Sequence, residues 1–460
     1  MDKGEKEKRL GNLGNQPINK LIPSMAAPMI ASSLMASVNN LVDTFFVSQI
    51  STAASGAVGI VFPLTILIHS IGITLAVGST SYVSRLLGQG NQNRASESVS
   101  ATFFTALFCS AMFTVLGSIF IEPMLKLFGA TDTILPYAMD YARILLLGGP
   151  FIALAFVLNF NLRAEGNVLL SMIGVVTGAI LNIILAPIFI FVLDFGIAGA
   201  AMATSISQMV NFTILCSHYI RGRSVLKLSL KLFRFEASMY KEIFRIGLSA
   251  FLRQILGVFS SILLNNFASA YGDAAIAAIS ISHRLVFFVA AVFLGICQGY
   301  QPVAGYNFGA KKFQRIREAF WFTYKMQLCF AVAAIAILFT FAPNIVSGFR
   351  PDPDVIAIGA FAVRAQILTA PFIAFAIVVT FSFQASGGGI ASIVLNTCRQ
   401  GWALIIVLLA MGTRFGIYGL IMAPVIADTV CVLIAFPMSK FFFRDLAARE
   451  EAAGLADTHM

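Results

Sequence analysis

The sequence has little charge for its length. Of its 460 residues, 11% are Asp, Glu, Lys or Arg, whereas 58% are hydrophobic. A soluble domain of this size carries a much larger charged fraction, so the composition excludes an ordinary globular protein. The net charge of +10 does not arise from basic helices with interleaved aromatic residues. We therefore expect that no nucleic acid is a partner.

Paired cysteines and catalytic motifs are also missing. The six cysteines are far apart and form no CxxC pair, so we expect neither disulfides nor a structural metal. The sequence contains no HExxH motif, no Ser/His/Asp constellation and no GxxxxGK[ST] phosphate loop. We expect no enzyme activity, no cofactor and no ATP hydrolysis. The polar first twenty residues predict no cleavable signal peptide.

What the sequence does contain is a series of apolar runs of about twenty residues, the length that crosses a bilayer. They predict about twelve spans, near residues 21–48, 55–86, 97–120, 137–162, 168–193, 196–219, 243–270, 276–306, 318–342, 355–384, 390–411 and 416–443. Between the spans, twenty Lys and Arg residues lie in one alternating set of connections. Only Lys126, Arg350 and Arg414 lie in the other set. This asymmetry predicts that both termini are cytoplasmic.

The two halves of the chain repeat each other. Gly78 and Arg94 recur as Gly299 and Arg315, each 221 residues later, and the segment 150–153 recurs as 371–374. Six spans per half make the repeats parallel in the membrane. The predicted fold class is an all-α membrane protein with twelve transmembrane helices in two pseudo-symmetric six-helix bundles. The predicted parts are a tail 1–20, an N-lobe 21–219, a linker 220–242, a C-lobe 243–443 and a tail 444–460.

The linker 220–242 is amphipathic and basic. It fits a helix that lies on the membrane surface, and it fits an extended cytoplasmic loop equally well. Arg163 and Glu165 end the fourth predicted span at a cytoplasmic end. We interpret them as a gate or a surface pair.

Asp43 is the only acidic residue in the first apolar run. An ionised carboxylate that faces lipid at a helix centre costs roughly 2.5–3.5 kcal/mol, so we expect Asp43 to face a protein-lined or aqueous interior. Asn39 and Asn40 lie one turn away on the same helix and make this region polar. Asp43 is therefore a candidate ion or substrate site, and packing against a partner near the helix end is the alternative.

Several segments resemble the multidrug and toxic compound extrusion (MATE) family. They are residues 40–47, 178–189 and 195–204, and also residues 299–310, which resemble a bacterial branch of that family most. The similarity extends from Lys20 to Phe443. It implies a multi-pass protein of the bacterial cell membrane, a monomer among membrane lipids, that exports drug-like small molecules in exchange for H⁺ or Na⁺.

The resemblance also implies a cation-coupling site in the N-lobe. In the family, an acid of the first helix, an Asn and an Asp four residues apart in the fifth, and a Thr of the sixth line a cavity. These positions are Asp43, Asn182, Ala186 and Thr204 here, so this chain has Ala186 in place of the usual acid. The remaining oxygen donors suit a hard monovalent cation with one negative charge only. Burial of a lone carboxylate also favours its protonated form, which suits proton coupling.

Other polar residues in the apolar runs are candidates for the substrate cavity, although most such residues only link helices. They are Asn39, Asn40, Gln208, Gln254, Gln298, Gln301 and Asp428. Asp428 either contacts a cationic substrate or pairs with a buried arginine such as Arg399, and we favour the pair.

Three functions compete. The first is an exporter of bulky amphipathic or cationic compounds that works by alternating access. The second is a flippase for lipid-linked sugars from the same wider superfamily, which Arg253, Arg284, Arg364 and Arg399 within the spans favour. The third is a membrane-embedded enzyme or receptor, for which no catalytic motif is present.

Overall fold

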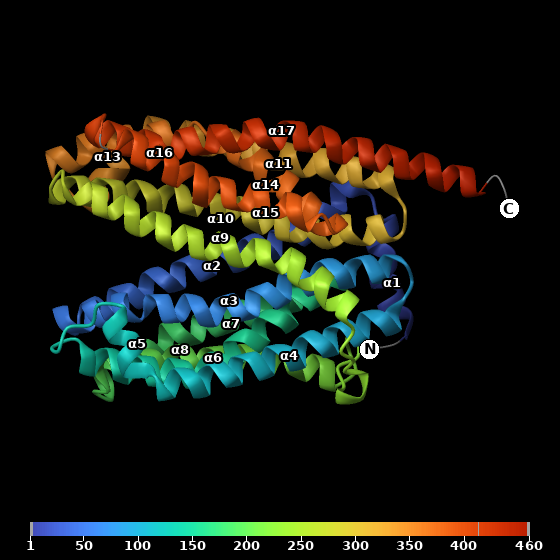
Figure 1. The fold of residues 1–460 in the computed structure, drawn as a ribbon, viewed down its shortest axis with the longest axis horizontal. Helices are drawn as coiled ribbons and strands as arrows, with labels where there is room; N and C mark the ends of the chain where they lie inside the picture. Colours follow the sequence, from blue (N-terminus) through green and yellow to red (C-terminus); the bar gives the residue numbers. More distant parts are fainter. Residues whose placement is uncertain (1–2, 413, 458–460) are drawn as a thin grey trace. The chain divides into compact units, whose positions relative to one another are not determined.

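The chain is helical almost throughout (Figure 1). The computed structural model describes residues 3–412 and 414–457, and none of these residues lies in a β-strand. A helix bonds its own backbone N–H and C=O groups, as a chain in hydrocarbon must. The predicted all-α fold class is confirmed.

The helices of the first half are α1 (Lys3–Asn15), α2 (Ile18–Ser48), α3 (Thr52–Gly88), α4 (Gln92–Ile119), α5 (Ile121–Leu127), α6 (Leu135–Ala164), α7 (Val168–Pro187), the π-helical turn η1 (Ile188–Val192) and α8 (Gly196–Ile220). The short 3₁₀ turn η2 (Leu230–Leu232) lies between the halves.

The helices of the second half are α9 (Ala237–Ser269), α10 (Asp273–Gly309), α11 (Phe313–Thr340), α12 (Ala342–Phe349), α13 (Pro353–Ile367), α14 (Ala370–Ser386), α15 (Gly389–Thr397), the π-helical turn η3 (Cys398–Trp402), α16 (Ala403–Met411) and α17 (Gly416–Asp457).

Ten helices of the described residues are long and apolar enough to cross a membrane, or eleven if α13 and α14, bent by 46°, form one span. The predicted span that does not pass this test is the sixth, residues 196–219. Its helix α8 has 25 residues, which is long enough, but Ser205, Ser207, Gln208 and Asn211 lower its hydropathy. Such polar side chains are expected of a helix that faces a protein interior.

The chain forms two compact units that do not coincide with the two sequence halves. The first unit contains the residues up to Asn15 and Ala31–Gly247, and the second contains Gln16–Ile30 and the residues from Leu248 on. The start of α2 therefore belongs to the unit of the second half, and the start of α9 belongs to the unit of the first half. The lobes 21–219 and 243–443, drawn from the repeat, do not include this exchange.

The exchange is itself repeated. In the first unit, Arg94 Nη2 lies 2.6 Å from Glu236 Oε1, directly before α9. In the second unit, the equivalent Arg315 donates from Nη2 to the backbone oxygen of Gln16, shortly before α2, at 2.8 Å. Each unit thus uses the same arginine of its repeat to hold the chain at the start of the exchanged helix.

The 221-residue repeat extends to buried hydrogen bonds. Ser79 Oγ donates to Asn161 Oδ1 at 2.9 Å in the first unit. The equivalent positions in the second unit are Tyr300 and Ser382, whose hydroxyl oxygens lie 2.8 Å apart. The residue types differ, but both pairs link the same two helices of their repeat, α3 to α6 and α10 to α14. The repeat found in the sequence is therefore a repeat of structure.

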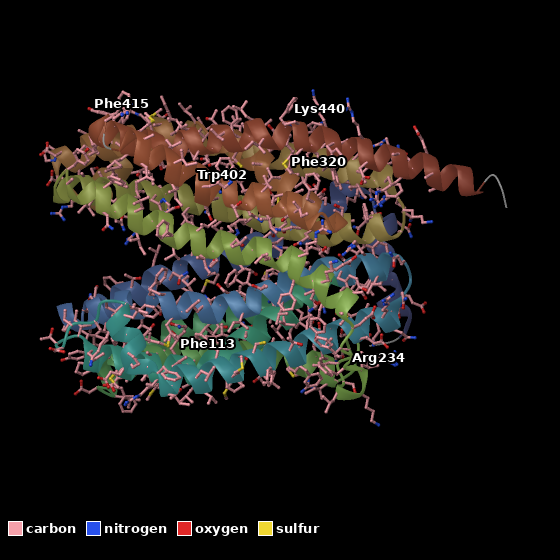
Figure 2. The ribbon with its side chains drawn as sticks, viewed as in Figure 1. Phe113, Arg234, Phe320, Trp402, Phe415 and Lys440 are labelled. Carbon is pink, nitrogen blue, oxygen red and sulfur yellow. The ribbon has the colours of Figure 1, made fainter. Side chains whose placement is uncertain are left out.

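Each unit has apolar cores of its own. In the first, α3 and α6 pack around Val61, Leu64 and Leu146, and Phe113 of α4 covers this cluster (Figure 2). In the second, Leu264 and Leu420 belong to one cluster, and Val346 belongs to another.

The linker after α8 is not a surface helix. Only η2 is helical between residues 221 and 236, so the extended alternative holds. Glu165, which is fully buried, fixes its first residues: its Oε2 accepts hydrogen bonds from Ser224 Oγ at 2.6 Å and from the Val225 backbone nitrogen at 2.8 Å. Its Oε1 lies 3.9 Å from Arg9 Nη1 of α1. Burial raises the pKa of Glu165, and these hydrogen bonds and Arg9 oppose that rise.

The predicted pairing of Arg163 with Glu165 at the surface is wrong. Both side chains are buried, and Arg163 donates from Nε to Ser171 Oγ at 2.9 Å and also bonds Asn159. Arg163 is the last-turn residue of α6 and points back along the helix, whereas Glu165 follows the helix end and turns to the linker. Two residues of opposite charge and near-adjacent number are therefore separated by the end of a helix.

Helices in the first unit approach each other most closely at glycines. A Cβ on Gly78 of α3 would lie 2.1 Å from the backbone oxygen of Ile243 on α9, and one on Gly247 would lie 2.0 Å from that of Thr74. Backbones can approach this closely in a membrane only where the side chain is a hydrogen atom.

We predict that Gly78→Ala destabilises the protein by about 1–3 kcal/mol, because the added methyl group forces α3 and α9 apart. The measurement is the melting temperature in detergent, with Gly59→Ala as the matched control. Gly59 lies on the same helix, and a Cβ added there would meet no atom within 4 Å. A melting temperature for Gly78→Ala equal to that of the control would contradict the close crossing.

Candidate functional site

A small apolar seam joins α2, α7 and α8 in the first unit. Val47 of α2, Ala186 of α7, and Ala200 and Ala203 of α8 are all buried and form one cluster. Alanines at this seam let the three backbones come close together. The seam therefore fixes which residues of these helices lie at the same depth.

The three predicted coupling residues lie one turn from this seam. Asp43 precedes Val47 by four residues, and Asn182 precedes Ala186 by four. Thr204 follows Ala200 by four residues on a helix that runs the opposite way. A four-residue step along a helix keeps the same face, so all three side chains move to the same side of the seam. Asn182 Nδ2 donates to Thr204 Oγ1 at 3.1 Å, which confirms that these two lie at one level.

Asp43 has no ion-pair partner within the described part of the chain. Asn39 Nδ2 donates to Asp43 Oδ2 over a long 3.4 Å, and this is the one hydrogen bond of the carboxylate there. Tyr141 of α6 is half-buried and close enough to interact electrostatically with Asp43. These neighbours fit the expectation that Asp43 faces a protein-lined interior, and both readings, an ion or substrate site and packing against a partner near the helix end, stay predictions.

Two oxygens in this region lack a hydrogen-bond partner. The Asn39 and Asn182 side-chain oxygens are each buried and receive no hydrogen bond. A buried carbonyl oxygen without a donor costs about 1–3 kcal/mol, and a bound cation or a protonated carboxyl group removes that cost. Together with the Asp43 carboxylate and the Thr204 hydroxyl, they are the all-oxygen donors that a hard monovalent cation prefers.

Ala186 itself lies in the apolar seam rather than among these oxygens. Its exposed fraction is 1%, and its neighbours in the cluster include Val47 and Ala203. The small methyl group keeps this part of α7 dry. The donors in this region therefore carry one negative charge, that of Asp43.

The buried acid of the second unit, Asp428, has an ion-pair partner. Arg399 Nε donates to Asp428 Oδ1 at 2.8 Å, so the predicted pair is confirmed. Thr369 Oγ1 donates to Asp428 Oδ2 at 3.1 Å, so both carboxylate oxygens are used. Asp428 has no oxygen without a partner to offer a cationic substrate, and its role as a substrate contact remains a prediction.

The other candidate residues do not gather around one point. Gln208 Oε1 accepts a hydrogen bond from Asn211 Nδ2 at 3.3 Å in the first unit, a link within α8. Asn40 is exposed, and its backbone oxygen is bonded by Thr44. In the second unit, Gln301 is buried and its Nε2 has no acceptor, whereas Gln254 and Gln298 are half-buried. Their roles remain predictions.

Sequence reasoning missed two neighbours of the acids, Tyr141 and Thr369. Tyr141 lies on α6 and Thr369 lies in the break between α13 and α14, each distant in sequence from its acid, and neither belongs to a motif. Helical spacing relates residues of one helix only, so no signal in the sequence pointed to either residue.

Comparison with known proteins agrees with this architecture. The MatE family model matches residues 28–188 and again 250–410, one match in each half. Multidrug export protein MepA of Staphylococcus aureus (strain MSSA476) is 28% identical over 441 residues, which cover 96% of this chain and 97% of MepA. MepA of Staphylococcus haemolyticus is also 28% identical, over 94% of this chain and 95% of that protein. The bacterial branch predicted from residues 299–310 is thus confirmed.

Solved structures show the same fold. A crystal structure of MATE in complex with MaL6 superposes with a TM-score of 0.90 at 25% identity, over 95% of this chain and 99% of that one. An outward-facing multidrug resistance MATE family transporter of the MOP superfamily gives the same TM-score and identity, over 95% and 98%. With two family matches that together span most of the chain, this multi-pass membrane protein belongs to the MatE family.

Proposed function

We propose that this protein is a secondary active multidrug exporter that expels bulky amphipathic compounds in exchange for a cation. The single observation that carries the proposal is the position of Asp43. It is an acid within a membrane span, without an ion-pair partner in the described structure, and its one hydrogen bond comes from Asn39, whose buried side-chain oxygen lacks a donor. The names of the MepA relatives and of the MATE structures support the export of drugs.

The coupling step follows from the charge of this site. Asp43 holds either a proton or Na⁺, and release of that ion leaves a carboxylate that must be stabilised by polar neighbours. One carboxylate neutralises one monovalent cation, and the absence of an acid at Ala186 favours H⁺ over Na⁺. Alternating access of the substrate site then couples outward transport of the drug to inward movement of the ion.

The remaining expectations belong to this proposal. Both termini are cytoplasmic, because basic residues lie in the connections on that side. The transporter works as a monomer surrounded by membrane lipids. A flippase for lipid-linked sugars is the second candidate, favoured by the arginines inside the second unit. A phospholipid-like molecule that copurifies with the protein would support the flippase.

We predict that Asp43→Asn abolishes ion-driven efflux but preserves binding of the dye, because the amide mimics the protonated carboxyl group and cannot release a proton. The measurement is ethidium transport in proteoliposomes with imposed pH or Na⁺ gradients. Asp132→Asn, which removes an exposed acid, is the matched control. Efflux by Asp43→Asn at the rate of the control would show that Asp43 does not couple transport.

We also predict that Ala186→Asp makes the protein sensitive to Na⁺. The seam around Ala186 is apolar, so an unpaired carboxylate there costs about 2.5–3.5 kcal/mol and lowers the melting temperature. A cation bound between this carboxylate and Asp43 would offset the cost, because two nearby carboxylates resist ionising together. Na⁺ should then raise the melting temperature of Ala186→Asp and increase Na⁺-driven efflux.

The control for this prediction is Ala186→Asn, which has the same size without the charge. K⁺ at equal concentration separates ion binding from ionic strength. If Na⁺ shifts the melting temperature of both variants equally, position 186 does not belong to the coupling site.

A further inference from the structure

The second unit contains more positive than negative charge halfway along its membrane spans. Arg253 lies in the middle of α9, Arg399 in the π-helical turn η3, and Asp428 within α17. Asp428 neutralises Arg399 and is fully hydrogen-bonded. Among these three residues, one arginine is therefore in excess.

Arg253 is that arginine. It is half-buried, and the described residues give it neither a hydrogen bond nor an ion pair. Arg399 is the one charged group with a marked electrostatic effect on Arg253, and the two positive charges repel each other. An arginine in this position is costly inside a membrane unless a partner of opposite charge is present. In the described structure the protein supplies none.

The local packing brings the Arg253 side of α9 to η3. Gly401 of η3 departs from helical geometry, with φ −128° and ψ −114°, and a Cβ at that position would lie 2.6 Å from Leu256 of α9. Ser260 Oγ donates to the Gln400 backbone oxygen at 2.8 Å, one turn further along. Arg253 precedes Leu256 by three residues and therefore shares the face of α9 that η3 contacts.

The geometry of Arg399 leaves part of its guanidinium available. Its Nε is bound to Asp428, whereas neither Nη atom has a hydrogen bond within the described residues, and 21% of the side chain is exposed. His283 of α10 is exposed and also interacts electrostatically with Arg399. Arg253 and Arg399 thus lie on two packed segments, α9 and η3, and Asp428 holds Arg399 in place.

We propose that Arg253 and Arg399 form a binding site for an anionic group in the second unit: the carboxylate, sulfate or phosphate of an amphipathic molecule. Guanidinium groups bind such groups by paired, charge-assisted hydrogen bonds. Asp428 positions Arg399 and prevents it from turning away. The site extends the proposed export function, on which it rests, to amphipathic substrates that carry an acid, and the same chemistry would hold a lipid phosphate.

The test uses two fluorescent probes that differ in one charge, 11-(dansylamino)undecanoic acid and its methyl ester. We expect the purified full-length protein to bind the acid about tenfold more tightly than the ester, the effect of one charge-assisted hydrogen bond. Arg253→Gln should remove this preference, and Arg253→Lys should keep part of it. Arg284→Gln, which removes an exposed arginine of α10, is the matched control and should keep all of it.

Two outcomes overturn the proposal: equal affinity of the unaltered protein for acid and ester, or equal loss of the preference in Arg253→Gln and Arg284→Gln. Melting temperatures of the variants exclude misfolding as the cause. Nanodiscs with and without phosphatidylglycerol identify the source of the anion. Displacement of the acid probe by this lipid assigns the site to lipid phosphate, and retention assigns it to the substrate.

Ethidium efflux separates this inference from the proposed function. Ethidium is a cation and does not need the arginine site, so its efflux by the unaltered protein tests the export function independently of the anion site. If the unaltered protein fails to export ethidium under any gradient, the export function fails. If it exports ethidium but binds acid and ester equally, only the anion site fails.

Discussion

The cost of an unpaired charge inside a membrane is the constraint on which this structure depends. Asp43 and Asp428 are acids within its spans, and the two units stabilise them differently. Asp428 is matched by Arg399 and Thr369 and has no free oxygen. Asp43 receives one long hydrogen bond from an amide and has no cationic partner in the described residues. A fully paired acid stabilises a fold but does not exchange ions, whereas a weakly bonded acid is poised to take up and release one.

Internal duplication explains how one frame holds two such different sites. The pairs Ser79–Asn161 and Tyr300–Ser382 occupy equivalent positions and link equivalent helices, although the residue types have changed. Arg94 holds the chain before α9 by an ion pair, and Arg315 holds the chain before α2 by a hydrogen bond to its backbone. Repeat positions that join helices have thus kept their role, and positions that face the interior have diverged. The helix arrangement is therefore repeated in the two units, whereas the charged groups within their spans differ.

Much of this architecture could be predicted from the sequence, because it follows from short-range rules. Apolar length placed the spans, a fixed offset revealed the repeat, and one-turn spacing put Asn182 beside the seam at Ala186. Contacts between distant helices could not be predicted in this way. Tyr141 approaches Asp43 from another helix, and Glu165 turns to the linker instead of pairing with Arg163. The choice between a linker helix and an extended chain was also decided by a tertiary contact, the Glu165 carboxylate that binds Ser224 and Val225.

The unpaired charges within the two units have opposite signs. This difference affects where an antiporter can bind its coupling ion and its substrate. If both units carried an unpaired acid, the coupling ion and a cationic drug would compete for equal sites in either unit. Here the first unit carries the weakly bonded carboxylate of Asp43, and the second carries the excess charge of Arg253. A cation is therefore attracted to one unit and repelled by the other, so the ion and an acidic substrate need not share a site. Under this arrangement, transport is coupled through the conformation of the protein and not through direct displacement of one ligand by the other.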